Sequence, residues 1–496
     1  MTETGAVSPL PQRVDWDGTQ LHLVLAPHAQ VDVCLDAQHY ARLRADAQGQ
    51  ARLALPFSPS GHARLNLQLR AGGIESAAVS LRLGYPGLAR AGETAALAPL
   101  GSQDYVDVAA QADGLAREVA IVIPVYNAPA AVAACLDSVL AHTRGAARLI
   151  VIDDASPDPA VAELLARYRD CRGLTVLGNE RNLGFTATAN RGIAAAGSAD
   201  VVLLNADTEV APHWLSGLRR AAWACADTAS ATAVSDNAGA FSVPELEQHN
   251  PFPQEWTFTD AALALRQQAG SAYPRLPTGN GFCLYLKRAV LDAIGVLDAQ
   301  AFPQGYGEEN DWCQRAEAAG WHHVIAGDVL VRHARSQSFG EQRRHTLGAA
   351  GMAVLRARWP RYEADVGASL YSPRRRVLDW RVRCAYAGSR PQPRVLCWEE
   401  AAAPAGFAVY RCWRAPEGLA LLAPDGTQCI EQHLADATVA AACSEAEWSA
   451  SFARLLQKYA IDRVYGALPS TFARVALLLA IDTDTVAAPR PFGRDA

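Results

Sequence analysis

Buried strands alternate with helices along the middle of this chain, beginning at residue 118. Continuous apolar runs such as VAIVIPV, RLIVIDD, LTVLGN and DVVLLNAD are typical of strands that are covered on both faces of a sheet. The segments between them, AVAACLDSVLAHT, AVAELLARYRD and FTATANRGIAAAG, have the apolar spacing of helices. This alternation predicts an α/β fold on a mostly parallel sheet with helices on both faces.

Polar side chains follow the predicted strands, at the edge of the sheet where such folds bind ligands. They are Tyr126 and Asn127, Asp153 and Asp154, 179–182 and 205–207. Carboxylate and amide oxygens suit a hard cation, and a cation suits phosphate. The chain has no P-loop, no Rossmann glycine fingerprint and no nucleophile elbow, so these three kinds of site are not supported.

Composition narrows the remaining classes of protein. A length of 496 residues suits two to four domains, and a 50% hydrophobic composition excludes a disordered chain. The formal net charge of −6 argues against nucleic acid as a partner held by a general basic surface. Eleven cysteines without a C-x-x-C pair suggest reduced thiols in a cytoplasmic protein. Neither a signal pattern nor an apolar run of membrane-spanning length is present.

Two other patterns flank the central one. Before it, residues 14–86 read as short strands with period-two alternation, which predicts an antiparallel β-sandwich. After it, helices are predicted over 289–294, 309–319 and 345–358, and a strand over 322–333. We therefore divide the chain into a β-sandwich at 1–100, an α/β core at 115–360, a linker or helical segment at 361–390 and a small Rossmann-like α/β domain at 391–496. The predicted connection from 85 to 114 is rich in Ala and Gly.

Seven motifs in order resemble family 2 glycosyltransferases of the GT-A fold. They are VAIVIPVYNA, VIDDAS, NERNLGFTATANRGI, LLNADTEVAP, PTGNGFCLYLKR, GYGEENDWCQRAEAAGW and VRHARSQSFG. The resemblance implies a metal-dependent, inverting hexosyltransferase that moves a sugar from a UDP- or dTDP-sugar to a hydroxyl of a glycan. The N-x-D at 205–207, where the family usually has D-x-D, is similar to rhamnosyltransferase-like members.

The resemblance places one set of residues around the donor nucleotide: Pro124, Tyr126, Asp154, Arg181, Asn182, Gly184 and Asn205. Asp154 would read the base by accepting from its ring N–H. Tyr126 alternatively is only an aromatic at a strand end, and Asp153 alternatively caps a turn. Asn205 supplies at most a neutral oxygen, to the ion, to ribose or to a water.

A second set would hold the ion and the acceptor. Asp207 and His333 resemble the ligands of Mg²⁺ or Mn²⁺, although a lone histidine is often structural. Glu309 stands in the position of the general base, where Asp is more usual, and the acceptor would contact Gly281, Glu308 and Trp312. Trp312 either stacks on a sugar or packs in the core, and Asp311 with Arg315 could form a helix-start charge network.

The implied acceptor is a growing bacterial surface glycan, O-antigen or capsule, free or lipid-linked. The basic run at 374–376, with Arg381 and Arg383, leaves two interpretations open. One is contact with anionic lipid at the inner face of the membrane. The other, which we favour, is a solvated face or a set of interdomain salt bridges. Two alternative functions remain: a non-catalytic glycan-binding or assembly protein, and one half of a two-site transferase that includes 391–496.

Overall fold

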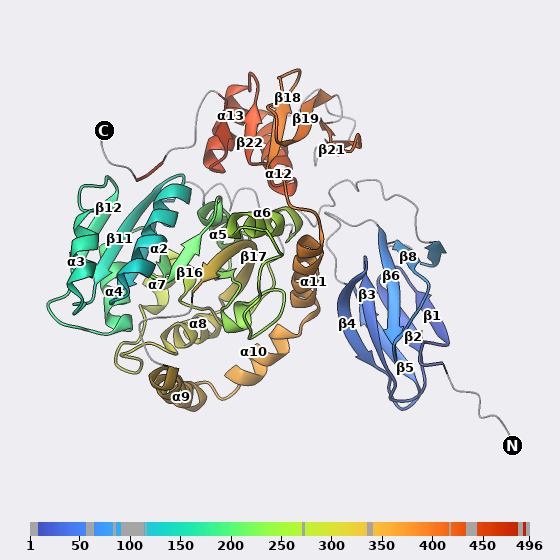
Figure 1. The fold of residues 1–496 in the computed structure, drawn as a ribbon, viewed down its shortest axis with the longest axis horizontal. Helices are drawn as coiled ribbons and strands as arrows, with labels where there is room; N and C mark the ends of the chain where they lie inside the picture. Colours follow the sequence, from blue (N-terminus) through green and yellow to red (C-terminus); the bar gives the residue numbers. More distant parts are fainter. Residues whose placement is uncertain are drawn as a thin grey trace.

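The structure is a computed structural model. It describes residues 8–55, 64–82, 86–90, 114, 117–269, 273–334, 341–415, 418–432, 444–484 and 490–492. Most of the connection predicted between 85 and 114 therefore lies outside the described residues. Figure 1 shows the described residues up to 90, in blue, beside a large central part, with residues 394–484, in orange and red, packed above it.

An eight-stranded sheet forms the centre, in the order β12-β11-β10-β13-β16-β15-β17-β14. Its strands are β10 (Val119–Val125), β11 (Ala147–Asp153), β12 (Leu174–Gly178), β13 (Asp200–Leu204), β14 (Thr208–Val210), β15 (Thr228–Val234), β16 (Cys283–Leu286) and β17 (His322–His333). The first four of that order are parallel, whereas β16 and β14 pair antiparallel with their neighbours. The predicted α/β class is confirmed, and so is the predicted strand at 322–333.

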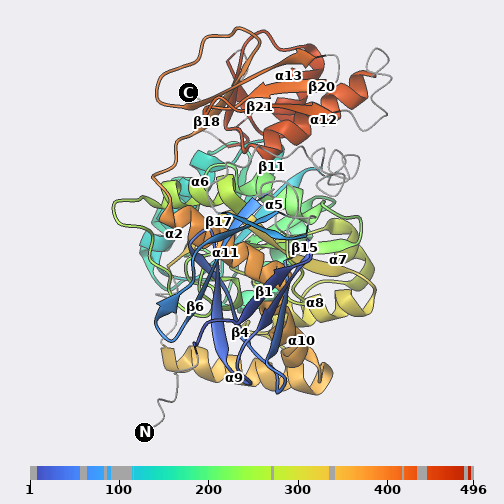
Figure 2. The same ribbon diagram turned by 90° about the vertical axis from the view of Figure 1, so that its right-hand side faces the viewer.

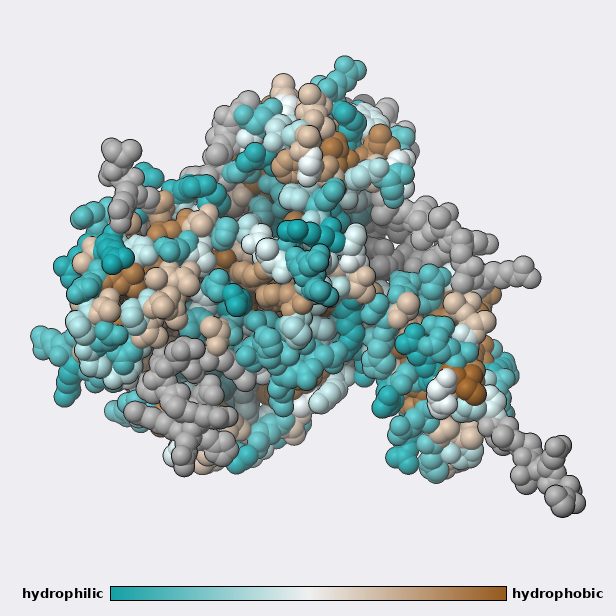
Figure 3. All heavy atoms as spheres, in the orientation of Figure 1, coloured by the Kyte–Doolittle hydropathy of each residue, from teal (hydrophilic) through white to brown (hydrophobic). Residues whose placement is uncertain are grey.

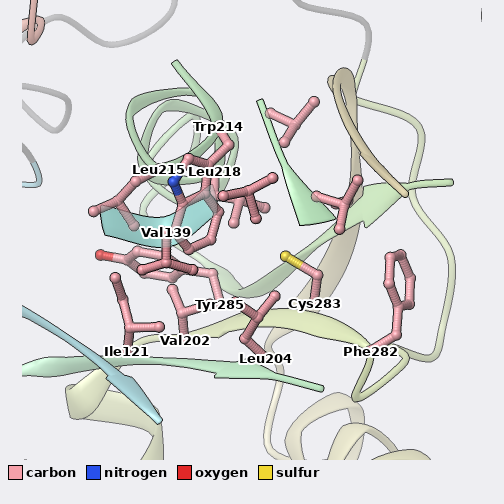
Figure 4. Packing of buried hydrophobic residues seen from close by; sticks show 14 of the residues in the cluster. Ile121, Val139, Val202, Leu204, Trp214, Leu215, Leu218, Phe282, Cys283 and Tyr285 are labelled. Atoms are coloured by element: carbon pink, nitrogen blue, oxygen red, sulfur yellow. The ribbon is translucent and has the colours of Figure 1, made fainter. Parts of the chain in front are cut away.

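Helices cover both faces of this sheet. They are α2 (Pro129–His142), α3 (Pro159–Ala166), α4 (Phe185–Ala195), α5 (Trp214–Ala222), α6 (Phe258–Ala269), α7 (Arg288–Ile294) and α8 (Glu308–Ala318). Successive residues of β10 point to opposite faces. Ile121 packs with Val139 of α2 and Trp214 of α5 (Figure 4), whereas Val122 belongs to a second cluster that includes α4, α7 and α8.

Two antiparallel sheets make up the N-terminal part. One contains β1 (Arg13–Trp16), β2 (Gln20–Val24) and β5 (Gln50–Ala54). The other contains β4 (Gln38–Arg44), β3 (Gln30–Leu35), β6 (Arg64–Ala71), β8 (Val79–Arg82) and β9 (Leu88–Arg90), and β7 (Ile74–Glu75) pairs with β6. One cluster of buried side chains draws on both sheets, which is compatible with the predicted sandwich.

The C-terminal part is a mixed sheet with two helices. Its elements are β18 (Arg394–Trp398), β19 (Ala408–Ala415), β20 (Gly418–Leu422), β21 (Gln428–Gln432), α12 (Glu445–Lys458), β22 (Arg463–Tyr465), α13 (Ser470–Leu478) and β23 (Asp482–Thr483). Strands β19, β18, β22 and β23 are parallel neighbours, which is compatible with the predicted Rossmann-like pattern. Arg266 of α6 joins this part to the core by an ion pair of 2.6 Å with Asp462.

Three helices connect the core to the C-terminal part: α9 (Glu341–Arg358), α10 (Tyr362–Leu370) and α11 (Pro373–Ala387). Ser372 caps α11 by accepting a hydrogen bond from Arg375 N, so it marks the start of a helix. Helix α11 lies between the core and the sandwich (Figures 1 and 2). Its Leu378 and Val382 pack in the core cluster, and its Val377 and Trp380 pack in the sandwich cluster.

The arginines of α11 mostly make contacts between the parts of the chain. Arg375 is buried and donates to the carbonyl oxygens of Ala240 and Ser242, at 2.7 and 2.6 Å. Arg383 donates to Glu245 at 2.9 Å and to the carbonyl of His39 at 3.3 Å. These contacts agree with the interdomain interpretation of the basic run.

The outer surface is mixed in character. The face drawn in Figure 3 is largely hydrophilic, with hydrophobic residues in small separate groups. Within the described residues, every helix is too short or too polar to cross a bilayer.

Candidate active site

A pocket of about 570 Å³ opens where strands β10, β11 and β13 end. Most of the residues predicted for the site line it: Pro124, Tyr126, Asp154, Asn182, Gly184, Asn205, Asp207, Gly281, Glu308, Glu309 and His333. The core sheet thus brings together residues that lie more than 200 positions apart in the sequence, such as Pro124 and His333. Arg181 is exposed and does not line the pocket.

Asp154 fixes the loop on the donor side. Its Oδ1 accepts hydrogen bonds from Asn179 Nδ2 at 2.6 Å and from Leu183 N at 2.8 Å, and its Oδ2 accepts one from Gly184 N at 3.0 Å. A carboxylate offers about four lone-pair positions. These bonds therefore leave roughly one acceptor position of Asp154 without a donor among the described residues. The neighbouring Asp153 accepts from Ser156 N, which is the turn-capping role that the sequence left open.

Gly184 sits where the donor loop meets the start of α4. Its φ of 84° lies in the left-handed region, and an added Cβ would lie 2.2 Å from the carbonyl oxygen of Pro303. Only glycine satisfies both conditions without strain. Asn182 supports the same turn because its Oδ1 accepts from Gly184 N at 3.1 Å.

Asp207 and His333 face each other at the end of β17. Strand β14 pairs Thr208 with His333, and this register places Asp207 Oδ1 3.4 Å from His333 Nε2. The other ring nitrogen, Nδ1, lies 3.2 Å from the carbonyl oxygen of Asn237. Because a carbonyl only accepts, Nδ1 carries the proton in that contact, and the ring is thereby oriented with Nε2 toward Asp207. Phe282 stacks on the ring at 5.4 Å and holds its plane.

These two side chains fit a divalent ion in part. The described residues contain no cluster of three or more His, Cys, Asp or Glu side chains able to hold a metal ion. Asp207 and His333 supply one carboxylate oxygen and one imidazole nitrogen. Two protein donors suit a hard cation that takes its other ligands from phosphate and water. Asn205 lines the same pocket and could add only a neutral amide oxygen.

Two adjacent glutamates line the pocket from the first turn of α8. Glu308 is buried, and its Oε2 accepts from Gly307 N at 3.1 Å. Burial, followed by the nearby charge of Glu309, raises the pKa of Glu308 well above its usual value. Burial also raises the pKa of Glu309. Both carboxyl groups therefore hold a proton to higher pH than free glutamates do, and the pKa of Glu308 is shifted well above its usual value.

Glu309 lines the pocket beside Glu308. Its Oε2 is buried at the pocket and has no hydrogen-bond partner among the described residues. A buried carboxylate oxygen without a donor is poorly stabilised and is therefore a good proton acceptor.

Some residues singled out by sequence are structural. Trp312 is fully buried, donates from Nε1 to the carbonyl of Gly295 at 2.9 Å, and does not line the pocket. Asp311 accepts from Arg315, Arg358 and Trp359, which is the charge network that the sequence left open. Neither Trp312 nor Asp311 lines the pocket, so neither is placed to contact an acceptor.

Sequence reasoning missed part of the pocket wall. Phe185, Gln304 and Tyr306 also line it. The glycines around Tyr306, in PQGYG directly before the acidic motif, were an available signal of close backbone packing.

Residues 120–295 match the model of Glycosyl transferase family 2. This segment includes the donor side of the pocket and Asp207, and it ends before the Glu308–Glu309 pair and His333. The matching segment therefore contains Asp154, Asn182 and Gly184, while the acidic pair comes from the part of the chain that follows it.

Two curated proteins are similar to this region. A Sinorhizobium fredii protein, y4gI, is 27% identical over 236 residues, which are 45% of this chain and 25% of that protein. An uncharacterized glycosyltransferase of Escherichia coli, YibD, is 33% identical over 96 residues, which are 19% of this chain and 28% of that protein. The aligned region thus spans about a quarter of the length of each relative.

Two solved structures share a partial likeness. The structure of GalNAc-T7 with UDP, GalNAc and Mn²⁺ aligns with a TM-score of 0.39 and 17% identity over 50% of this chain and 49% of that one. The mannosyltransferase PcManGT from Pyrobaculum calidifontis, in complex with GDP-Man and Mn²⁺, aligns with a TM-score of 0.37 and 18% identity over 55% of this chain and 73% of that one.

Proposed function

We propose that this chain is an inverting glycosyltransferase of the GT-A type, which moves a sugar from a UDP- or dTDP-sugar to a hydroxyl of a glycan. One observation carries the proposal. Glu309, whose pKa is raised by burial, and the Asp207–His333 pair line the same pocket, and a segment that matches a glycosyltransferase family forms part of its wall. A base and an electrostatic clamp for a leaving group are what a single displacement requires.

In this proposal Glu309 takes the proton from the acceptor hydroxyl as its oxygen attacks the anomeric carbon. Glu308 stays protonated, which leaves the negative charge of the pair on Glu309. The nucleotide would leave along the donor wall, which Asp154, Asn182 and Gly184 form. Attack and departure on opposite faces of the sugar invert the configuration of its anomeric carbon.

Asp207 and His333 would hold Mg²⁺ or Mn²⁺ on the nucleotide side. When bound, a divalent ion supplies positive charge to the diphosphate as it departs. The protonated Nδ1 of His333, fixed by the carbonyl of Asn237, keeps the Nε2 lone pair directed at that place.

The acceptor belongs to the same proposal. We assign the chain to the rhamnosyltransferase-like members on its N-x-D motif, and to the synthesis of a bacterial surface glycan such as O-antigen or capsule, free or lipid-linked. Synthesis would take place in the cytoplasm, where nucleotide-sugars serve as donors. Gly281 and Glu308 line the acceptor wall of the pocket.

A donor screen tests the proposal. Purified protein is incubated with UDP- and dTDP-sugars and Mn²⁺, released nucleotide is measured, and NMR reports the anomeric configuration of any product. We expect release with one donor class and inversion in the product. Calorimetry that finds no metal-dependent binding of UDP or dTDP would contradict the enzyme assignment. Full activity in Glu309→Gln would contradict the proposed base.

A further inference from the structure

The backbone directly before the base is bent in an uncommon way. Residues Gly305, Tyr306 and Gly307 have φ values of 88°, 66° and 139°, so three consecutive residues lie at positive φ. For Tyr306, which has a Cβ, this conformation costs free energy and persists only where the surroundings impose it. Glu308 and Glu309 follow at once as the first residues of α8. We call residues 302–307 the base loop.

One side of the base loop packs on the donor wall. The carbonyl oxygen of Pro303 lies 2.2 Å from where a Cβ on Gly184 would be, so the two backbones touch. In the same place Thr186 Oγ1 donates to the carbonyl of Phe302. A shift of the base loop toward α4 is therefore blocked by backbone atoms rather than by flexible side chains.

Helix α9 blocks the other side. A Cβ on Gly351 would lie 1.7 Å from the carbonyl oxygen of Tyr306, so the helix backbone lies directly against the base loop. One turn further on, Leu355 is buried with Phe302, and its Cδ1 lies 3.5 Å from where a Cβ on Gly307 would be. Gly351 and Leu355 thus flank the residues with positive φ.

The end of α9 is tied to the same helix that carries the base. Arg358 Nη1 donates to Asp311 Oδ1 at 3.1 Å, and Trp359 Nε1 donates to the same oxygen at 3.0 Å. Asp311 is two residues after Glu309 on α8. Helix α9 therefore contacts α8 beyond the base and the base loop before it.

We propose that α9 positions the base, with Gly351 as the positioning residue: its contact with the Tyr306 carbonyl holds the base loop against Gly184 and so sets where the Glu309 carboxylate stands in the pocket. This inference rests on the proposed function for the role of Glu309 but adds an element outside the segment that matches the family. Since an error of about 1 Å in a reacting group can cost ~100-fold in rate, such a contact is consequential.

Two glycines of α9 make a matched test. Gly351→Ala forces the base loop or the helix to move, whereas a Cβ on Gly348 meets nothing within 4 Å. We expect Gly351→Ala to lower kcat for transfer about 10- to 100-fold, with the donor KM and the Kd for Mn²⁺ with UDP unchanged. Gly348→Ala should leave all three unchanged. Equal kcat in the two variants would overturn the proposal.

Hydrogen exchange provides a readout that does not need activity. Amide exchange of 303–309 should be faster in Gly351→Ala than in Gly348→Ala, because the base loop loses one of its two supports. If the wild-type chain transfers no sugar from any donor, the proposed function fails. The exchange measurement still tests whether Gly351 holds the base loop in place. Unchanged exchange at 303–309 overturns it.

Leu355→Val covers the case in which Gly351→Ala does not fold. The shorter side chain opens space beside Gly307 instead of forcing a clash. We expect the same changes with a smaller magnitude: a lower kcat and faster amide exchange at 303–309, with an unchanged donor KM. A donor KM that rises while kcat stays constant would contradict the proposal.

Discussion

His333 Nε2 lies 3.4 Å from Asp207 Oδ1, and the pairing of β14 with β17 sets this separation. The two residues are far apart in the sequence, and the edge of the sheet joins them. The ring has contacts on three sides: Asp207, the Asn237 carbonyl and Phe282. A side chain held so firmly is suited to a ligand that must not move during a reaction.

Replacing this histidine should weaken metal binding. In His333→Ala, we expect the affinity for Mn²⁺ in the presence of UDP to fall by at least about tenfold, measured by calorimetry, because one of two protein donors is gone. His249→Ala is a suitable control, since His249 is exposed and contacts Asp236, the residue that accepts from His333 N. Equal losses in both variants would show that the ring of His333 is not a ligand.

The buried acid pair should make stability depend on pH. The pKa of Glu308 is raised in the folded state, so the folded protein holds its proton to higher pH than the unfolded chain does. The stability that this proton provides is complete below the unfolded pKa and is lost as pH rises through the folded pKa. Glu308→Gln, which is neutral at every pH, should therefore gain stability over wild type as pH rises.

Urea unfolding at pH 5 and pH 8 measures this difference. We expect the free energy of unfolding of Glu308→Gln, relative to wild type, to be more favourable at pH 8 than at pH 5. Glu163→Gln, at an exposed position of α3, is the control and should show no such trend. A pH-independent difference for Glu308→Gln would contradict the assignment of the proton.

The contact between α11 and the sandwich should contribute strongly to stability. Trp380 is fully buried, donates from Nε1 to the Leu35 carbonyl at 2.8 Å, and meets the ring of Tyr40 edge-on at 6.4 Å. Trp380→Ala should lower the free energy of unfolding by about 3–5 kcal/mol. Tyr371→Ala, at a position that is 72% exposed, should change it little. Denaturant unfolding of both variants makes the comparison.

Removing the Arg266 side chain should weaken the contact between the C-terminal part and the core. Its guanidinium donates to Asp462 at 2.6 Å and to the carbonyls of Ala460 and Ile461 at 3.0 and 2.9 Å. Arg266→Ala leaves Asp462 largely buried without its main partner, which costs about 3–5 kcal/mol. We expect faster proteolysis around 388–393 with the transfer rate preserved. Proteolysis at the wild-type rate would show that other contacts suffice.

Local patterns in the sequence predicted the elements whose burial is continuous. The strand at 322–333 and the helices that follow β10 and β12 were found because their apolar spacing is regular. Strand β14 and helices α5 and α6 were not predicted. Strand β14 has only three residues, too few for a period, whereas α5 has a clear apolar face in its sequence, which was an available signal.

The site residues also differ in how far the sequence predicts them. The strand-end residues Asp154 and Asp207 follow from the topology of the sheet, because polar groups collect where parallel strands end. The burial of Trp312 does not follow, since the sequence shows an aromatic residue on α8 but not which side of α8 meets the core. The positive φ of Tyr306 is likewise set by Gly184 and Gly351, which are distant in the sequence.

Helix α11 belongs to two hydrophobic cores at once, and this has a mechanical consequence. Neighbouring residues Val377 and Leu378 point into different clusters, so neither cluster is complete without the other side of the helix. The sandwich therefore cannot swing about its connection as a tethered module would. Any molecule that binds to the sandwich is therefore held at a fixed distance and orientation from the pocket.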